Sequence, residues 1–141
     1  MNELLQSYGL CVLVLSLKML AISLYQGYFR LRYLAFANAE DAAVFSRNAA
    51  AQELPQVQRA ARAWLNDLEN IPVFFVFGAL AVVLHTPVEL TSVLFCVFTS
   101  ARILHTVMYL AGWQPWRTLA FALGLLSLVA LATLLGAALL R

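Results

Sequence analysis

Charged residues are scarce in this sequence. Asp, Glu, Lys and Arg make up only 11% of the 141 residues, whereas hydrophobic residues make up 63%. A water-soluble globular domain carries about a quarter charged residues, so this composition excludes an ordinary soluble enzyme. The formal net charge is only +2, and no basic patch is interleaved with aromatic residues, so we expect no nucleic-acid partner.

Cysteine is equally rare, and Cys11 and Cys96 are the two examples. Each lies within an apolar run, and their spacing matches neither a metal site nor a disulfide framework. We therefore expect two buried, small hydrophobic side chains and no metal ion. The first residues, MNELLQSYG, include no basic residue, so the first apolar run is predicted to be a retained helix and not a cleaved signal peptide.

The sequence contains four long apolar runs. A membrane-spanning helix needs about 20 apolar residues, and three of the four runs are at least that long. The runs are Leu10–Phe29, Ile71–Leu84, Thr91–Ala111 and Thr118–Leu140. They predict an all-α protein, an integral membrane four-helix bundle that forms a single domain over residues 1–141.

The predicted helices extend a little beyond these runs. They cover about residues 4–32, 55–84, 89–111 and 116–140, with a loop at about residues 33–54. Within the loop, Asn38 is a suitable N-cap for a short helix whose first turn holds Glu40 and Asp41. Pro55 suits the first turn of the second long helix, and Pro72 inside that helix predicts a kink.

The arginines predict how the bundle is oriented in the membrane. Five lie between the first and second runs, and one follows the turn between the third and fourth runs: Arg30, Arg32, Arg47, Arg59, Arg62 and Arg117. Because short cytoplasmic loops are enriched in Lys and Arg, we expect both termini outside and the loop at residues 33–54 in the cytoplasm. Eight arginines against one lysine indicate a GC-rich, bacterial genome and therefore a bacterial inner membrane.

The second apolar run is too short to span a membrane by itself. Its 14 residues form about 21 Å of helix, whereas the hydrocarbon core is about 30 Å thick. The helix must therefore include residues back to Leu65, which brings Asn66, Asp67 and Glu69 to the cytoplasmic edge of the bilayer. Polar side chains there cannot face lipid cheaply, so they must face protein, water or a polar ligand.

Polar residues also follow helical spacing, which places them on shared faces. Arg62, Asn66 and Glu69 share one face of the second helix, while Asp67 points away from it. On the third helix the same spacing joins Arg102, His105, Thr106 and Tyr109.

Charges within the predicted spans balance, with Lys18 and Arg102 against Asp67 and Glu69. We expect internal pairs, Lys18 with Asp67 and Arg102 with Glu69. An alternative is that these polar groups only hold the helices together, at about 1 kcal/mol for each hydrogen bond. The number of donors at one leaflet favours a binding site.

The start of the fourth helix forms a third polar face. Arg117 and Thr118 occupy its first turn, where free backbone N–H groups and the helix dipole favour an anion. Arg30 and Arg32 end the first helix on the same side of the membrane. Such a site suits a small anion whose carboxylates bind guanidinium groups, and it shifts a thiol toward thiolate. Alternatively, Arg117 is an interfacial anchor that reaches toward the headgroups.

Four ordered segments resemble a known family and together cover nearly the whole chain. They read RLRYLAFANAED, RAWLNDLENIPVFF, RILHTVMYL and QPWR. They are similar to segments of the MAPEG proteins, the membrane-associated proteins of eicosanoid and glutathione metabolism, in the branch with microsomal glutathione transferase and microsomal prostaglandin E synthase. The resemblance implies four-helix subunits that form homotrimers and bind glutathione between subunits, near the cytoplasmic side.

The resemblance also implies roles for individual residues. Asn66 and Glu69 match residues that bind the glutathione main chain. Arg117 and Thr118 match the pair beside the thiol and are the expected catalytic residues. The remaining matches to the glutathione site are Arg30, expected to reach the ligand from the neighbouring subunit, and Arg62, Arg102, His105 and Tyr109.

Three positions depart from the family pattern and bear on the activity. Trp64 stands where the motif usually has histidine, Leu65 where the prostaglandin synthase has arginine, and Phe121 where that synthase has a tyrosine. We therefore expect a glutathione transferase or peroxidase that acts on lipophilic electrophiles or lipid hydroperoxides from the bilayer. The alternatives are a prostaglandin E synthase-like isomerase and a non-catalytic, lipid-binding member of the family.

Overall fold

A computed structural model describes residues 3–140 of the chain. It contains five helices in chain order, α1 (Glu3–Tyr33), α2 (Ala39–Val44), α3 (Pro55–Val83), α4 (Val88–Ala111) and α5 (Trp116–Leu139). All regular secondary structure in this part of the chain is helical, which confirms the predicted all-α fold. The four long helices α1, α3, α4 and α5 are each long and apolar enough to cross a membrane, as a multi-pass integral membrane protein requires.

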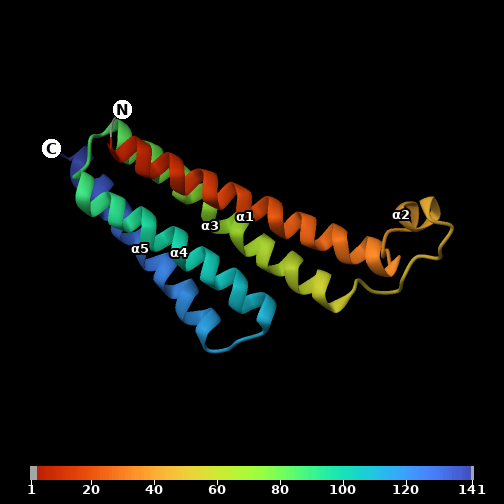
Figure 1. Cartoon of the computed structure of the whole chain (residues 1–141). Helices are drawn as coiled ribbons and strands as arrows, with labels where there is room; N and C mark the ends of the chain where they lie inside the picture. Colours follow the sequence, from red (N-terminus) through yellow and green to blue (C-terminus); the bar gives the residue numbers. More distant parts are fainter. Residues whose placement is uncertain (1–2, 141) are drawn as a thin grey trace.

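The four long helices lie side by side, and both ends of the chain lie at the same end of the bundle (Figure 1). α3 packs against α1, α4 and α5, and α4 packs against α1, α3 and α5. At the other end, α1 and α3 extend beyond α4 and α5 and carry the connection that contains α2 (Figure 1). Polar groups on α3 and α4 are therefore the ones placed to meet inside the bundle.

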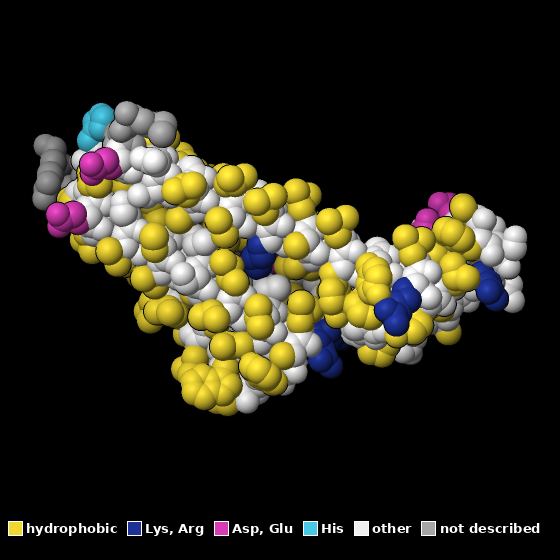
Figure 2. Space-filling model, viewed as in Figure 1, with side chains coloured by type: hydrophobic (Ala, Val, Ile, Leu, Met, Phe, Trp, Pro, Cys, Tyr) yellow, Lys and Arg dark blue, Asp and Glu magenta, His cyan; other side chains and the backbone are white. Residues whose placement is uncertain are grey.

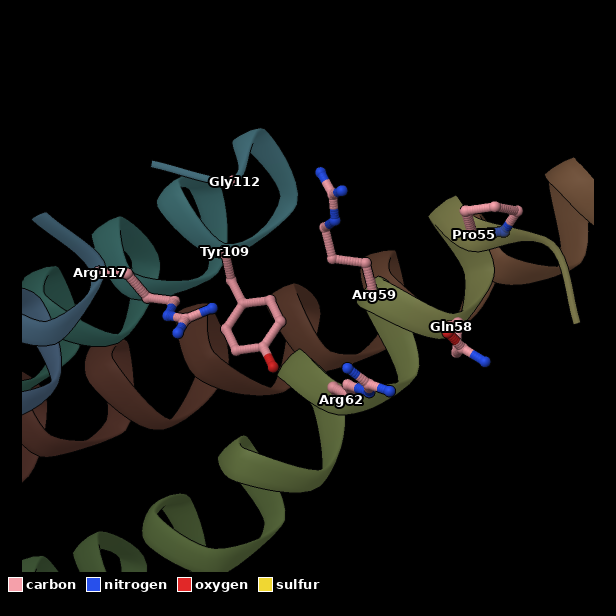
Figure 3. A pocket seen from close by; sticks show the side chains of 7 residues that line it. All are labelled: Pro55, Gln58, Arg59, Arg62, Tyr109, Gly112 and Arg117. Carbon is pink, nitrogen blue, oxygen red and sulfur yellow. The ribbon is translucent and has the colours of Figure 1, made fainter. Parts of the chain in front are cut away.

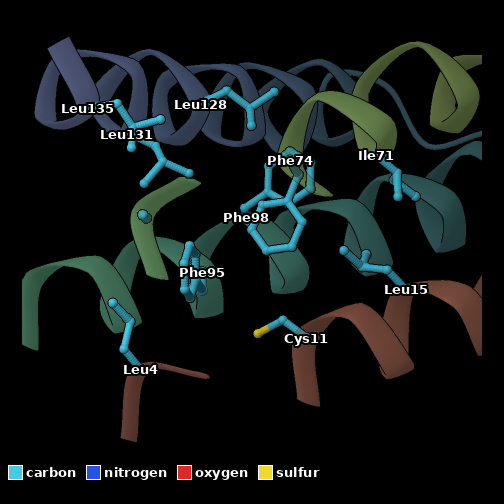
Figure 4. Close-up of a cluster of buried hydrophobic side chains, with 11 residues drawn as sticks. Leu4, Cys11, Leu15, Ile71, Phe74, Phe95, Phe98, Leu128, Leu131 and Leu135 are labelled. Carbon is cyan, nitrogen blue, oxygen red and sulfur yellow. The ribbon is translucent and has the colours of Figure 1, made fainter. Parts of the chain in front are cut away.

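Aromatic rings fill the core in the half of the bundle near the chain ends. Phe74 of α3 stacks on Phe98 of α4, with ring centroids 4.6 Å apart, and meets the edge of Phe95 at 5.5 Å (Figure 4). Tyr8 of α1 joins them, and its hydroxyl donates to the carbonyl of Phe75 at 2.7 Å. Gly78 gives this ring its space, because a Cβ there would lie 2.6 Å from Cδ2 of Tyr8 and closer still to Cε2. The core thus ties α1, α3 and α4 together away from the charged residues.

The predicted helix starts are confirmed at two places. Asn38 caps α2, and its side chain accepts a hydrogen bond from the backbone N–H of Glu40 at 3.2 Å. Pro55 occupies the first turn of α3. Pro72 lies within α3, which is assigned as one continuous helix from Pro55 to Val83.

The two cysteines have different environments. Cys11 is buried, as predicted, whereas Cys96 is exposed on α4. The prediction for Cys96 was wrong because hydrophobic side chains also cover the outer face of a membrane helix, so an apolar run does not identify the buried face.

Large hydrophobic side chains cover the outside of the bundle (Figure 2). Leu24 of α1, Val83 of α3 and Leu126 of α5 are 74%, 70% and 65% exposed, which suits contact with lipid. Basic side chains gather toward the end of the bundle that carries α2 (Figure 2). That end is the one predicted to face the cytoplasm.

Candidate functional site

Two adjoining cavities lie where α3 begins and α4 ends. The first, of about 300 Å³, is called the arginine cavity and is lined by Pro55, Gln58, Arg59, Arg62, Tyr109, Gly112 and Arg117 (Figure 3). The second, of about 250 Å³, is called the histidine cavity and is lined by Asn66, His105, Tyr109, Arg117, Thr118 and Phe121. Because Tyr109 and Arg117 line both, the two cavities are neighbours and together form the candidate site.

Six of the nine predicted site residues line these cavities. The structure brings together two from α3, two from α4 and two from the first turn of α5: Arg62, Asn66, His105, Tyr109, Arg117 and Thr118. The pairs on α3 and α4 are each four residues apart, so each pair lies on one face of its helix. Side chains from three different helices therefore converge on a single site.

Arg117 and Tyr109 form the wall between the cavities. The guanidinium carbon of Arg117 lies 4.5 Å from the centre of the Tyr109 ring, within the range of a cation–π interaction. In the view of Figure 3, the Tyr109 ring lies between the guanidinium groups of Arg117 and Arg62. An anion in either cavity therefore meets a guanidinium group of Arg117.

Gln114 is a site residue that the sequence analysis did not single out. With its amide oxygen turned toward the arginine, Gln114 accepts from Nε of Arg117 at 3.2 Å, and its amide nitrogen donates to Oγ1 of Thr118 at 3.0 Å. This orientation is the one that satisfies both partners. Gln114 precedes Arg117 by three residues and Thr118 by four, and the turn before α5 brings its amide to both side chains. Gln114 thus holds the two predicted catalytic side chains side by side.

The predicted free backbone N–H groups at the start of α5 are not free. The N–H of Arg117 donates to the carbonyl of Trp113 at 3.1 Å, and that of Thr118 donates to Pro115 at 2.9 Å. The prediction was wrong because the turn before α5 supplies its own carbonyl acceptors. Positive charge at this wall therefore comes from the guanidinium group of Arg117 and the helix dipole.

Arg102 lies behind the cavities and not in their lining. It is 1% exposed, and its Nη2 donates to Oδ1 of Asp67 at 2.7 Å and to Oδ1 of Asn66 at 2.5 Å. Lys18 donates to the other oxygen of Asp67 at 2.5 Å. The predicted pair of Lys18 with Asp67 is confirmed, whereas the predicted pair of Arg102 with Glu69 is wrong.

Arg102 pairs with Asp67 and not with Glu69 because these two acidic side chains of α3 point in different directions. Asp67 points into the bundle and is 0% exposed, whereas Glu69 lies two residues further along the helix and is exposed. The stem of Arg102 runs past Gly124 of α5. Arg102 therefore reaches the acidic side chain that is inside the bundle.

Arg30 and Glu69 line neither cavity of this chain. Nη2 and Nε of Arg30 both donate to Oε2 of Glu53, at 2.6 Å and 3.1 Å. It lines a separate groove of about 220 Å³ with Ser23, Gln26 and Trp64. Trp64, the departure from the family's histidine, therefore borders the Arg30 groove and lines neither cavity.

Arg59 is a second residue of the site that was missed. Its Nη1 donates to the carbonyl of Leu110 at 3.0 Å, next to Gly112, whose φ of +73° ends α4 in a left-handed conformation. Arg59 precedes Arg62 by three residues, so it lies on the same face of α3 as Arg62 and Asn66. The helical spacing could therefore have identified it. Arg59 both fixes the α3–α4 contact and adds a third guanidinium group to the arginine cavity.

The chemistry of the cavities favours an anion that also forms hydrogen bonds. Three guanidinium groups line the arginine cavity, and neither cavity is lined by an Asp or Glu residue. Among the described residues, Nδ1 of His105 and Oγ1 of Thr106 are buried without a hydrogen-bond partner. Guanidinium groups bind carboxylates in a bidentate manner, so a small molecule with carboxylates and amides fits this set of donors.

Comparisons with known proteins find similarity over most of the chain. The model of the MAPEG family matches residues 8–137. Microsomal glutathione S-transferase 1 of Rattus norvegicus is 36% identical over 128 residues, which are 87% of this chain and 83% of the relative. The same enzyme of Homo sapiens is 36% identical over 129 residues. Prostaglandin E synthase of Bos taurus is 34% identical over 132 residues, 93% of this chain and 86% of the relative.

Proposed function

Because the chain belongs to the MAPEG family, we propose that it is a glutathione-dependent membrane transferase acting on lipophilic electrophiles. Lipid hydroperoxides are a second class of substrate in this proposal. The observation that carries it is the wall of Arg117 and Tyr109 between two cavities that no acidic side chain lines. That arrangement suits a tripeptide whose two carboxylates and thiolate are anionic.

Residues of three helices bind glutathione in this proposal. Arg62 pairs with a carboxylate, while Asn66, His105 and Tyr109 form hydrogen bonds with the peptide groups. Arg30 and Glu69 lie outside the cavities of one subunit, so they act from a neighbouring copy in the family-like homotrimer. Arg102 acts indirectly, by donating a hydrogen bond to the Asn66 side chain from behind the cavity lining.

Arg117 stabilises the reacting thiolate, and Thr118 donates a hydrogen bond beside it. A free cysteine thiol has a pKa of about 8.5, and a nearby cation lowers it. The thiolate sulfur attacks the electrophilic carbon, a carbon–sulfur bond forms, and the leaving group departs with its electron pair. With a hydroperoxide, two glutathione molecules reduce one peroxide to an alcohol and water and form a disulfide.

The lipophilic substrate reaches this site from the bilayer. Phe121 of α5 lines the histidine cavity about one turn further along α5 than Arg117, and α5 exposes apolar residues such as Leu119 and Leu125. Glutathione enters from the opposite, cytoplasmic end, where the arginine cavity and the connection with α2 lie. In this topology both termini are outside the cytoplasm, and the membrane is the inner membrane of a bacterium.

Conjugation of glutathione to a chloronitrobenzene tests the transferase. Purified protein in detergent should release chloride and form the thioether, and the spectrum of bound glutathione should show thiolate absorbance at neutral pH. Arg117→Ala should retain glutathione binding but lose most of the thiolate absorbance. Thiolate formation that is unchanged in this variant would remove Arg117 from the proposed mechanism.

A glutathione-dependent isomerase is the second candidate, because prostaglandin E synthases are also among the relatives. The product formed from a lipid endoperoxide separates the two, since an isomerase forms no glutathione conjugate. A non-catalytic, lipid-binding protein is distinguished by the absence of any glutathione thiolate spectrum.

A further inference from the structure

Two buried cations share a single carboxylate in the middle of the bundle. Lys18 of α1, Asp67 of α3 and Arg102 of α4, here called the buried triad, are joined by contacts of 2.5 and 2.7 Å. The side chains of Asp67 and Arg102 are 0% and 1% exposed, and that of Lys18 is 10% exposed. The triad therefore carries a net positive charge. Buried ion pairs are often no more stabilising than apolar residues of similar volume, so stability alone does not account for the triad.

The triad is connected to the candidate site through one side chain. Nη2 of Arg102 donates to both Asp67 and Asn66, and Asn66 lines the histidine cavity. A guanidinium group has donors only, so the oxygen of the Asn66 amide must face Arg102. The amide nitrogen of Asn66 is then directed away from Arg102 and serves as a donor.

We propose that Lys18 and Asp67 are positioning residues, which hold Arg102 so that Asn66 presents a fixed hydrogen-bond donor to glutathione. This inference rests on the proposed function. Asp67 fixes the guanidinium group of Arg102, and Lys18 fixes Asp67 from the opposite side. The acceptor on the ligand is a carbonyl or carboxylate oxygen, because an amide N–H₂ group cannot bind the ammonium group of glutathione. The net charge of the triad also favours an anionic ligand in the adjacent cavity.

A thermodynamic cycle on glutathione affinity tests this connection. The four proteins are the wild type, Lys18→Met/Asp67→Leu, Asn66→Ala and the combined variant, each titrated with glutathione in a calorimeter. Loss of a hydrogen bond to a charged group costs about 1.5–3 kcal/mol, or at least tenfold in Kd. The triad variant should therefore bind at least tenfold more weakly than the wild type. In the Asn66→Ala background, the same substitutions should change Kd by less than twofold.

Asn66→Asp tests the direction of the hydrogen bond while the buried triad stays intact. The new carboxylate still accepts from Arg102, and its negative charge is compensated by the net positive triad, so folding is retained. Its second oxygen faces the cavity as an acceptor and has no proton to donate. Glutathione affinity should fall at least tenfold. Wild-type affinity in Asn66→Asp would overturn the donor assignment.

The control for a general loss of stability is Thr91→Val. Thr91 is fully buried and pairs with Thr86 at 2.9 Å at the other end of the bundle, so its substitution removes an interior hydrogen bond far from the cavities. Glutathione Kd should not change in this variant. If the losses of binding free energy in the triad variant and in Asn66→Ala add up in the combined variant, the inference is overturned and the proposed function still stands. A wild type that gives no heat with glutathione would overturn the proposed function itself.

Discussion

The guanidinium group of Arg117 stacks on the ring of Tyr109, at 4.5 Å from its centre. The two residues come from different helices, α5 and α4, and each lines both cavities. A flexible arginine thereby acquires a fixed position beside the place where the proposed thiolate forms. The packing of α4 against α5 is thus connected directly to the chemistry of the site.

Substitutions at Tyr109 should separate the role of the ring from that of the hydroxyl. Tyr109→Leu removes the ring under Arg117, and a partly exposed cation–π interaction contributes about 0.5–1 kcal/mol. We therefore expect the rate of conjugation per glutathione-bound enzyme to fall two- to fivefold. Tyr109→Phe keeps the ring and should keep that rate, so equal effects of the two substitutions would contradict a stacking role. Rates are measured at saturating glutathione.

Gln114 should be required for the joint placement of Arg117 and Thr118. Gln114→Ala removes the hydrogen bonds of the amide to Arg117 and to Thr118, at about 1 kcal/mol for each partner residue. We expect kcat/KM for the electrophile to fall about five- to thirtyfold, with little change in thermal stability because Gln114 is exposed. Gln52→Ala, an exposed glutamine in the connection before α3, is the matched control. Full activity of Gln114→Ala would show that Arg117 is fixed by Tyr109 alone.

The pH dependence of conjugation should report the charge on Arg117. The reactive species is the thiolate, which is populated above the pKa of the bound thiol, and a nearby cation lowers that pKa. Arg117→Gln removes the cation and should move the acidic limb of the profile of kcat toward higher pH. One pH unit corresponds to about 1.4 kcal/mol of lost thiolate stabilisation. A fall in kcat that is equal at every pH would point to a role in orientation and not in thiolate stabilisation.

Gly78 should be the glycine whose substitution most affects stability. In Gly78→Ala the new Cβ clashes with Cδ2 and Cε2 of the Tyr8 ring, whereas Gly9→Ala, on α1, meets nothing within 4 Å. Overpacking a core costs about 1–3 kcal/mol, so Gly78→Ala should lower the midpoint of thermal unfolding in detergent and Gly9→Ala should not. Adding Tyr8→Leu, which removes the opposing ring, should restore part of the loss.

The helices could be predicted from the sequence because their causes are local. Apolar runs of membrane-spanning length, the N-cap of Asn38 and the position of Pro55 each depend on residues within one or two turns. The pairing of Lys18 with Asp67 was also predicted, because opposite charges within the membrane must find each other. Predicting these features required no knowledge of how the helices pack.

The partner of Arg102 could not be predicted, because it depends on how α3 is rotated about its own axis. Asp67 and Glu69 are two residues apart and point in very different directions, and only the packing of α3 against α1 and α4 decides which one is inside. Gln114 and the engaged N–H groups of Arg117 and Thr118 were missed for a related reason. They depend on the conformation of the turn before α5, which spacing along a helix does not describe.

The single carboxylate of the buried triad has a consequence for the insertion of the chain into the bilayer. A lysine or arginine at the centre of an isolated spanning helix costs about 2.5–3.5 kcal/mol, and Lys18 lies at the middle of α1. Insertion of α1 into the bilayer therefore costs less free energy if α1 stays at the translocon until α3 has been synthesised and Asp67 can pair with Lys18. Earlier release of α1 would leave the ammonium group of Lys18 unpaired in lipid. We therefore expect α1 and α3 to enter the bilayer together.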